Sequence, residues 1–231
     1  MIKIIFFSVL VIIAESVLAQ GIDSINFTCG KSTIQYAGQT YHTVQIGSQC
    51  WLVENINAGT MIDSLQKQTN NGVIEKYCFG DNTANCATYG GLYQWGEALQ
   101  YQNGASDTSS PIPDINDNVK GICPSGWHIP AQAEFLALLT TISWDGNAMK
   151  AIGQGLGKGA GTDTSGFSAL LGSFRNNDGN FKTLSSCAVF WSSMEQNTTT
   201  SYSLTLKDDY YGIFLKSSPK ECGCSVRCLK D

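Results

Sequence analysis

The sequence predicts an exported α+β domain held together by disulfide bonds, and three observations support this class. Residues 1–19 combine a lysine, an apolar run and small residues before Ala19, the pattern of a cleaved secretory signal peptide. All nine cysteines follow this segment, and exported chains use cysteine mainly in disulfides. One helix-like apolar period lies in the middle of the chain, and β-like runs dominate its end.

Length and composition narrow the organisation and the partners. We divide the chain into a signal peptide (1–19), a short N-terminal segment (20–28) and one domain (29–231). Charged residues make up 14% of the chain and the net charge is −5, which argues against nucleic acid or an anionic membrane as partner. No apolar run after the signal peptide is long enough to span a bilayer. The expected location is outside the cell, on the cell surface or in the periplasm.

The first predicted element is a β-hairpin. Two β-like runs at 32–36 and 41–46 flank a turn at Gly38-Gln39. Cys29 and Cys50 are almost equidistant from this turn, and residues equidistant from a hairpin turn face each other. We therefore expect a Cys29–Cys50 disulfide at the open end of the hairpin.

The next segment contains a short cysteine loop and a weak helix. Turn-forming residues separate Cys78 from Cys86 in "CFGDNTANC", so a local disulfide between them is the simplest interpretation. The apolar residues of "LYQWGEALQY" at 92–101 fall on one helical face, although Gly96 weakens the helix. The loop that follows contains "DINDN" at 114–118, which could hold a cation but lacks the spacing of a calcium loop.

A second helix is predicted at 131–142. Its apolar residues recur at i, i+3, i+4 and i+7, and Pro130 stands where a helix start tolerates proline. Glu134 has the position of the acid in a capping box, although Ala131 lacks the matching hydroxyl. We interpret His128 as a capping or packing residue, because the other histidine, His42, is far away in the sequence.

The remainder of the chain is predicted to be β-structure after a glycine-rich surface loop. The loop at 153–166 lacks the spacing of a phosphate-binding loop. The segment "NNDG" at 176–179 predicts a hairpin turn. We expect strands at 167–174, 188–192, 202–206, 211–215 and 225–229.

Six segments occur in an order that resembles one known family: "YHTVQIGSQCWLVENINAGT", "YCFGDNTANCATYGGLYQWGEALQY", "GICPSGWHIPAQAEF", "SGFSALLGSFRNNDGNF", "FWSSME" and "SVRCLKD". Together they resemble the Fibrobacter succinogenes major paralogous domain of exported bacterial proteins, from about Cys29 to Asp231. The order of the elements is also similar to the C-type lectin-like fold, which formylglycine-generating enzymes share. The resemblance implies two short helices, a mixed but mostly antiparallel sheet and long loops.

The same resemblance implies one long-range disulfide. In lectin-like domains a cysteine near the first helix is bonded to a cysteine in the last strand, and the corresponding residues here are Cys123 and Cys228. Trp127 would then lie in the core between the helices and the sheet.

Three cysteines look like additions to the family pattern. We expect Cys187 to pair with Cys222 or Cys224, which leaves one sulfur without a partner. An exposed spare thiol predicts a disulfide-linked homodimer or a mixed disulfide. The alternative is that "KECGCSVRC" forms a thiol-based catalytic site.

Catalysis and metal binding have little support in the sequence. Two isolated histidines do not form a zinc site, and no G-x-S-x-G segment is present. C-type lectins bind sugar through calcium, but Trp191-Ser192-Ser193 replaces their W-N-D motif, and hydroxyls are weaker calcium ligands than carboxylates. We expect no enzyme activity, no metal and no cofactor, with calcium as a weak candidate only.

Ligand binding is the preferred functional interpretation. Polar residues are expected to form a rim around the aromatic Trp191, a combination that suits a sugar or a peptide. These polar residues are Arg175, Asn177, Asp178, Glu195 and Asn197. The alternative is that Trp191 belongs to the core and its neighbours only form turns. The sequence therefore predicts non-catalytic binding or adhesion to an extracellular glycan or protein; a structural surface protein without a small ligand and a thiol-based enzyme are the alternatives.

Overall fold

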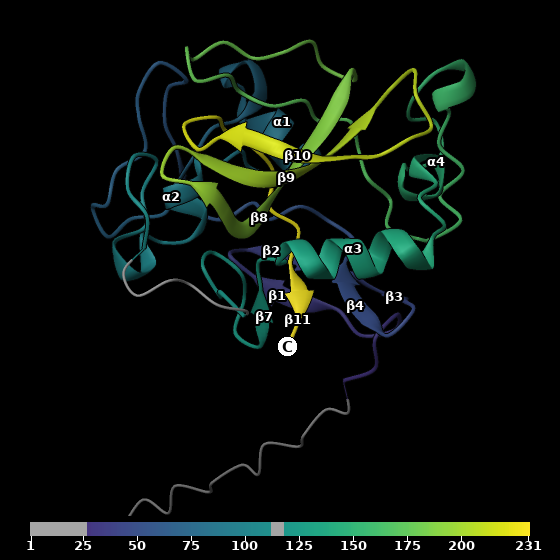
Figure 1. Cartoon of the computed structure of the whole chain (residues 1–231). Coiled ribbons are helices and arrows are strands. Elements are labelled where there is room, and N and C mark those ends of the chain that lie inside the picture. The colour runs from purple at the N-terminus through teal and green to yellow at the C-terminus, as the bar shows by residue number, and fades with distance from the viewer. Residues whose placement is uncertain (1–26, 112–117) are drawn as a thin grey trace, which may run out of the picture.

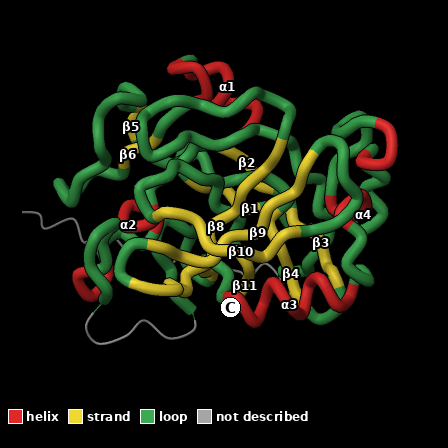
Figure 2. The backbone as a smooth tube through the Cα atoms, turned by 45° about the horizontal axis from the view of Figure 1, so that its top comes forward, coloured by secondary structure: helices red, strands yellow, loops and turns green. Residues whose placement is uncertain are grey.

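A computed structural model describes residues 27–111 and 118–231 as small sheets and short helices joined by long loops (Figures 1 and 2). The predicted signal peptide and residues 114–117 of the candidate cation-binding run lie outside these ranges. Within the two ranges, no helix has the length and apolar character needed to cross a membrane.

The strands of the described residues form four sheets, so the single mixed sheet implied by the resemblance is wrong. A three-stranded antiparallel sheet has the order β10-β9-β8, and a four-stranded antiparallel sheet has the order β3-β4-β11-β7. Two-stranded pairs are antiparallel β1-β2 and parallel β5-β6. The strands are β1 (Ile34–Tyr36), β2 (Gln39–Tyr41), β3 (Thr43–Ile46), β4 (Gln49–Leu52), β5 (Thr60–Met61), β6 (Glu75–Lys76), β7 (Trp127–His128), β8 (Cys187–Asn197), β9 (Thr200–Lys207), β10 (Phe214–Pro219) and β11 (Leu229–Lys230).

In the part of the chain that the structure describes, the helices are short and only one exceeds two turns. They are α1 (Thr83–Tyr89), α2 (Trp95–Ala98), α3 (Gln132–Thr141) and α4 (Gly146–Met149), with 3-10 turns at Phe79–Asp81, Gln102–Gly104 and Gly157–Gly159. The helix predicted at 131–142 is therefore confirmed within one residue at each end. In Figure 1, α3 lies between the three-stranded sheet and the four-stranded sheet.

Two apolar clusters make up the core of the described residues. In the first, Phe135 of α3 stacks on Trp51 of β4 at 5.8 Å between ring centroids. In the second, the indole nitrogens of Trp95 and Trp191 donate hydrogen bonds to the carbonyls of Ser192 and Tyr93, at 3.0 Å and 2.7 Å. The buried indole N–H groups of Trp95 and Trp191 thereby have the acceptors that burial requires.

Three disulfides join Cys29 to Cys50, Cys78 to Cys86 and Cys123 to Cys228, the three pairs expected from the sequence. The hairpin argument for the first pair is wrong, however. The turn lies at Ala37-Gly38, and continuing the register Ile34↔Tyr41 would place Cys29 opposite Ile46. Cys50 instead lies in β4, which pairs with β3 in another sheet.

Other predicted elements also differ from the structure. The strand expected at 211–215 is shifted to β10 (Phe214–Pro219), and the strand expected at 225–229 is reduced to β11 (Leu229–Lys230). Residues 167–174 form only isolated bridges, including one between Ser173 and Ala188 of β8, because Ser168 and Ser173 have positive φ values that interrupt an extended backbone. The helix expected at 92–101 shrinks to the four residues of α2. A Cβ atom at position 96 would lie only 3.0 Å from Ser106 Cα. Glycine at this position therefore allows the loop that contains Ser106 to approach the helix closely.

His128 links the middle of the chain to its end. Its ring is 2% exposed; Nδ1 lies 2.7 Å from Asp231 Oδ1 and Nε2 lies 3.0 Å from Glu134 Oε1. Only the protonated imidazole carries a hydrogen on both nitrogens. Burial acts to lower the pKa of His128, but the hydrogen bonds to Glu134 and Asp231 outweigh it and raise the pKa above its ordinary value. Glu134 also accepts from the Ala131 N–H, the one half of the capping box that an alanine permits.

This arrangement predicts a pH-dependent contribution to stability. A histidine whose pKa is raised by folding stabilises the protein fully at pH values below its pKa in the unfolded state, about 6.5. This stabilisation is lost as the pH rises through the pKa of the histidine in the folded state. We expect the free energy of unfolding, measured in urea from pH 6 to 9, to fall more steeply for the wild type than for His128→Gln. Parallel pH profiles would contradict the protonated assignment.

Candidate functional site

The rim predicted around Trp191 does not offer an aromatic face to a ligand. Trp191 is fully buried, and Arg175 is 3% exposed. Arg175 Nε donates to the Ser64 carbonyl at 2.6 Å, and its guanidinium stacks over the Tyr77 ring at 4.3 Å. Both residues therefore belong to the core, as the alternative interpretation of Trp191 anticipated.

The other four rim residues hold turns and one ion pair. Asn177 and Asp178 are exposed in the turn at 176–179, where Asp178 Oδ1 accepts from the Asn180 N–H at 3.0 Å. Glu195 pairs with buried Lys220 at 2.6 Å. Asn197 Oδ1 accepts from two backbone N–H groups of the β8–β9 turn, at 3.0 Å each. Nothing in this geometry directs these side chains toward a common ligand.

A better candidate site is a cavity of about 220 Å³ elsewhere on the domain. Its walls come from segments that are far apart in the sequence, and its lining mixes amide, hydroxyl, carboxylate and apolar groups. The lining consists of Gln39, residues 53–55, residues 87–90, Ala151, Ser168 with Leu170, and Arg227. No histidine or cysteine, the residues that most often activate or act as nucleophiles, lines this cavity.

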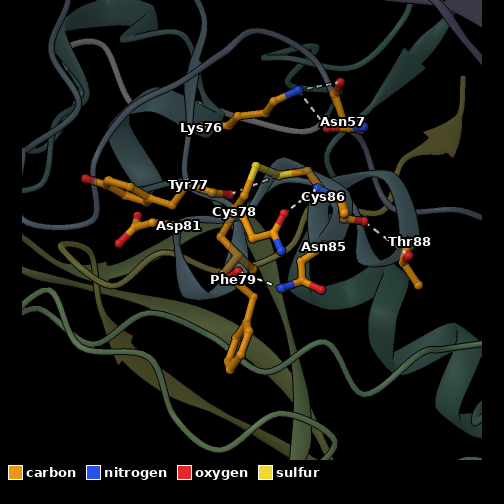
Figure 3. The surroundings of a disulfide bond; sticks show 12 residues. Asn57, Lys76, Tyr77, Cys78, Phe79, Asp81, Asn85, Cys86 and Thr88 are labelled. Atoms are coloured by element: carbon orange, nitrogen blue, oxygen red, sulfur yellow. Dashed lines mark hydrogen bonds between the residues drawn. A yellow bond between two sulfur atoms is a disulfide. The ribbon is translucent and has the colours of Figure 1, made fainter.

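The Cys78–Cys86 disulfide fixes one wall of the cavity. The bond ties the middle of α1 to the strand-like segment before it, and Cys86 Sγ lies 3.4 Å from the Tyr77 carbonyl oxygen (Figure 3). Asn82 caps the start of α1, because its Oδ1 accepts from the Ala84 N–H at 3.0 Å. Thr88, in the last turn, is thereby held at the cavity.

Gly90 brings this wall against the opposite side of the cavity. Its φ of +82° is in the left-handed region, and a Cβ there would lie 2.6 Å from Asn55 Cβ. A side chain at Gly90 would therefore push the two walls apart. Asn55 Nδ2 donates to the Tyr89 carbonyl at 2.8 Å, which holds the walls together.

The buried guanidinium of Arg227 lines the cavity on the core side. Nε donates to Asn55 Oδ1 at 2.9 Å, and Nη1 donates to the Phe167 carbonyl at 2.6 Å. The guanidinium also lies over the Phe167 ring at 4.4 Å. Burial lowers the pKa of Arg227 to about 9, and nearby Glu54 and Asp163 offset this only in part.

Carboxylate and hydroxyl groups border the cavity on its outer side. Glu54 accepts from the His42 backbone N–H and contacts the His42 ring nitrogen Nδ1, both at 2.7 Å. Ser168 donates to Asp163 Oδ2 at 2.6 Å. These groups can bind polar atoms of a small molecule through hydrogen bonds.

Sequence reasoning missed Asn55 and Arg227. Both lie inside segments that carry the family resemblance, "WLVENINAGT" and "SVRCLKD". One feature of the sequence could have indicated Arg227, because it stands between Val226 and Cys228 in a run of residue types that are usually buried. A buried arginine needs hydrogen-bond acceptors.

The prediction that Cys187 pairs with Cys222 or Cys224 is contradicted by the structure. All three remain thiols and all three are buried in one core cluster. Burial raises the pKa of each thiol, most strongly at Cys224. None of these three sulfurs is exposed to a second chain, so the reason for expecting a disulfide-linked homodimer no longer holds. The raised pKa values also argue against the thiol-based site.

We expect the three thiols to be unreactive in the folded protein. A thiol reagent added at pH 8 should label none of them rapidly, whereas unfolding in guanidinium should expose three thiols per chain. Rapid labelling of the native protein would show that the cluster opens. Fewer than three thiols after unfolding would show that Cys187 has found a partner.

The described residues do not bring three or more histidine, cysteine, aspartate or glutamate side chains together as metal ligands. In the turn at 176–179, Asp178 is exposed and holds the turn through its own hydrogen bond.

Comparison with known proteins gives one match. The family model described as the Fibrobacter succinogenes major domain matches residues 44–230, which is most of the chain. No curated protein and no solved structure matches the chain at the level required for a significant similarity.

Proposed function

We propose that this chain, which belongs to the Fibrobacter succinogenes major domain family, is an exported, non-catalytic binding domain. Its ligand would be a small polar group of an extracellular glycan or protein. The cavity bordered by Asn55, Thr88 and Arg227 would hold this group. The observation that carries the proposal is the cavity itself, which combines a buried cation with amide and hydroxyl groups.

Export and the C-type lectin-like architecture are parts of the same proposal. Three disulfides favour an oxidising compartment, and residues 1–19 have the pattern of a signal peptide. The final strand β11 lies between β4 and β7, and the Cys123–Cys228 bond ties this end of the chain to the middle. This closure of a long loop by the last strand is what the resemblance to lectin-like domains implies.

The size of the cavity restricts the ligand. Pockets for drug-sized molecules measure about 300–1,000 Å³. A cavity of about 220 Å³ accommodates one small group, such as a single sugar residue or one amino-acid side chain. A longer glycan or peptide would therefore place one unit inside and continue over the surface.

A glycan and peptide array with the mature chain (20–231) tests this function. We expect selective binding by the wild type, and loss of binding when Thr88→Trp fills the cavity. Thr140→Trp is a matched control, because both threonines lie near the end of a helix. Each hydroxyl donates a hydrogen bond to the carbonyl four residues earlier, at 3.2 Å for Thr88 and at 2.8 Å for Thr140.

Two outcomes would contradict the proposal. Silence of the wild type on both arrays would favour a structural surface protein without a small ligand. Selective binding that survives Thr88→Trp as well as Thr140→Trp would place the ligand elsewhere on the domain.

A further inference from the structure

We propose that the cavity is a carboxylate subsite, in which Arg227 binds the acid group of a hexuronic acid residue in an acidic glycan. This inference rests on the proposed function, because it assumes that the cavity is where the ligand binds. It adds the charge of the ligand and the residue that recognises it.

The first argument is the missing counter-ion. Arg227 is 1% exposed, yet no carboxylate among the described residues lies within ion-pair distance of its guanidinium. A buried charge without a partner is costly, and proteins normally pair it. An anion in the adjoining cavity would supply the counter-ion that the protein does not supply itself.

The second argument is the use of the guanidinium nitrogens. Asn55 Oδ1 and the Phe167 carbonyl accept from Nε and Nη1, and the Leu52 carbonyl lies 3.3 Å from Nη1. Within the described part of the chain, Nη2 donates no hydrogen bond to a protein acceptor. Because Arg227 lines the cavity, this nitrogen is the donor left for a ligand.

The third argument concerns the remainder of the lining. The amide of Gln39 and the hydroxyls of Thr88 and Ser168 can form hydrogen bonds with the hydroxyls of a sugar ring. An acidic amino-acid side chain has no such hydroxyls. Val53 and Leu170 supply apolar surface for the carbon face of a ring. A sugar that carries a carboxylate uses all of these groups, so we favour an acidic glycan over an acidic peptide.

The carboxylate of Glu54 weakens the binding of an anion at Arg227. Its carboxylate lines the same cavity but forms no ion pair with Arg227, and it is held by His42 at 2.7 Å. Removing this charge should favour a bound anion, because two like charges in one cavity repel each other. Glu54→Gln keeps an oxygen that can accept from His42 and removes only the charge.

The experiment titrates the mature chain with glucuronate, glucose and N-acetylglutamate by calorimetry. We expect glucuronate to bind at least about tenfold more tightly than glucose, since a charge-assisted hydrogen bond contributes most of the difference. Added salt should weaken the binding of glucuronate and leave that of glucose unchanged. Glu54→Gln should tighten glucuronate several-fold, whereas the control Glu221→Gln, whose carboxylate pairs with Lys67 outside the cavity, should not.

The outcomes separate this inference from the function on which it rests. Equal affinity for glucose and glucuronate, or no effect of Glu54→Gln, would overturn the carboxylate subsite while leaving a neutral binding cavity. Preference for N-acetylglutamate would overturn the glycan assignment in favour of an acidic peptide. If none of the three binds, the carboxylate subsite is wrong, and the array with Thr88→Trp decides separately whether the cavity binds anything.

Discussion

Replacing Cys123 and Cys228 together with alanine should lower the free energy of unfolding by about 4–5 kcal/mol. The bond closes a loop with a sequence separation of 105 residues, and the loop-entropy model gives a loop of this length about that effect. The bond also ties β11 into a sheet with β4 and β7, so we expect the loss to appear as one cooperative destabilisation. Urea unfolding of the wild type and the double variant measures the difference.

The Cys78→Ala and Cys86→Ala double variant is the matched control for this prediction. It removes a disulfide with a sequence separation of only 8 residues, for which the same model gives about 2–3 kcal/mol. A long-range variant that loses no more stability than the local one would contradict the role of Cys123–Cys228 in closing the fold.

Arg227→Met should cost about 3–5 kcal/mol of stability, even though the new side chain keeps much of the volume. The substitution leaves the buried Asn55 Oδ1 and the carbonyls of Leu52 and Phe167 without their donor. Each buried acceptor left unpaired costs about 1–3 kcal/mol, and the stacking on Phe167 is lost as well.

Lys230→Met is the control for Arg227→Met. Lys230 also places a positive charge over an aromatic ring, that of Phe27, but its side chain is partly exposed. We expect a change below about 1 kcal/mol there. Equal losses in the two variants would show that overall charge, and not the hydrogen bonds of Arg227, explains the effect. Chemical denaturation at one pH is sufficient for this comparison.

The sequence predicted those elements that depend on local periodicity or on a strong family pattern. The period of Phe135, Leu138 and Leu139 predicts α3, because one apolar face is enough to define a helix that packs between two sheets. The Cys123–Cys228 pair followed from the family resemblance. In contrast, the Cys29–Cys50 pair was predicted for a reason that the structure does not support.

The elements that were missed depend on contacts that no local pattern encodes. The strand expected at 167–174 is interrupted at Ser168 and Ser173, which have positive φ values and donate side-chain hydrogen bonds to Asp163 and to the Lys182 carbonyl. Helix α1 lies between Cys78 and Gly90, where turn-forming residues dominate, and its start depends on the Asn82 cap. Turn-forming residues and helix caps are the same residue types, so composition alone does not separate them.

The candidate site could not be predicted for a similar reason. Trp191 and Arg175 have the chemistry of a binding rim, but burial decides their role, and burial follows from the packing of β8 and its neighbours. Asn55 and Arg227 are 172 residues apart in the sequence and meet through one hydrogen bond of 2.9 Å. A contact of this range becomes visible only when the fold is known.

The most direct test of the cavity as the binding site is a nuclear magnetic resonance titration of the ¹⁵N-labelled mature chain with a ligand found on the arrays. The side-chain amides of Asn55 and Gln39 report on the cavity. Those of Asn177 and Asn197 report on the exposed turns that the sequence predicted to form a rim around Trp191. We expect the first pair and the backbone amides of residues 87–90 to shift with ligand concentration, while the second pair stays unchanged. Shifts at Asn177 and Asn197 with an unchanged Asn55 would contradict the cavity as the binding site.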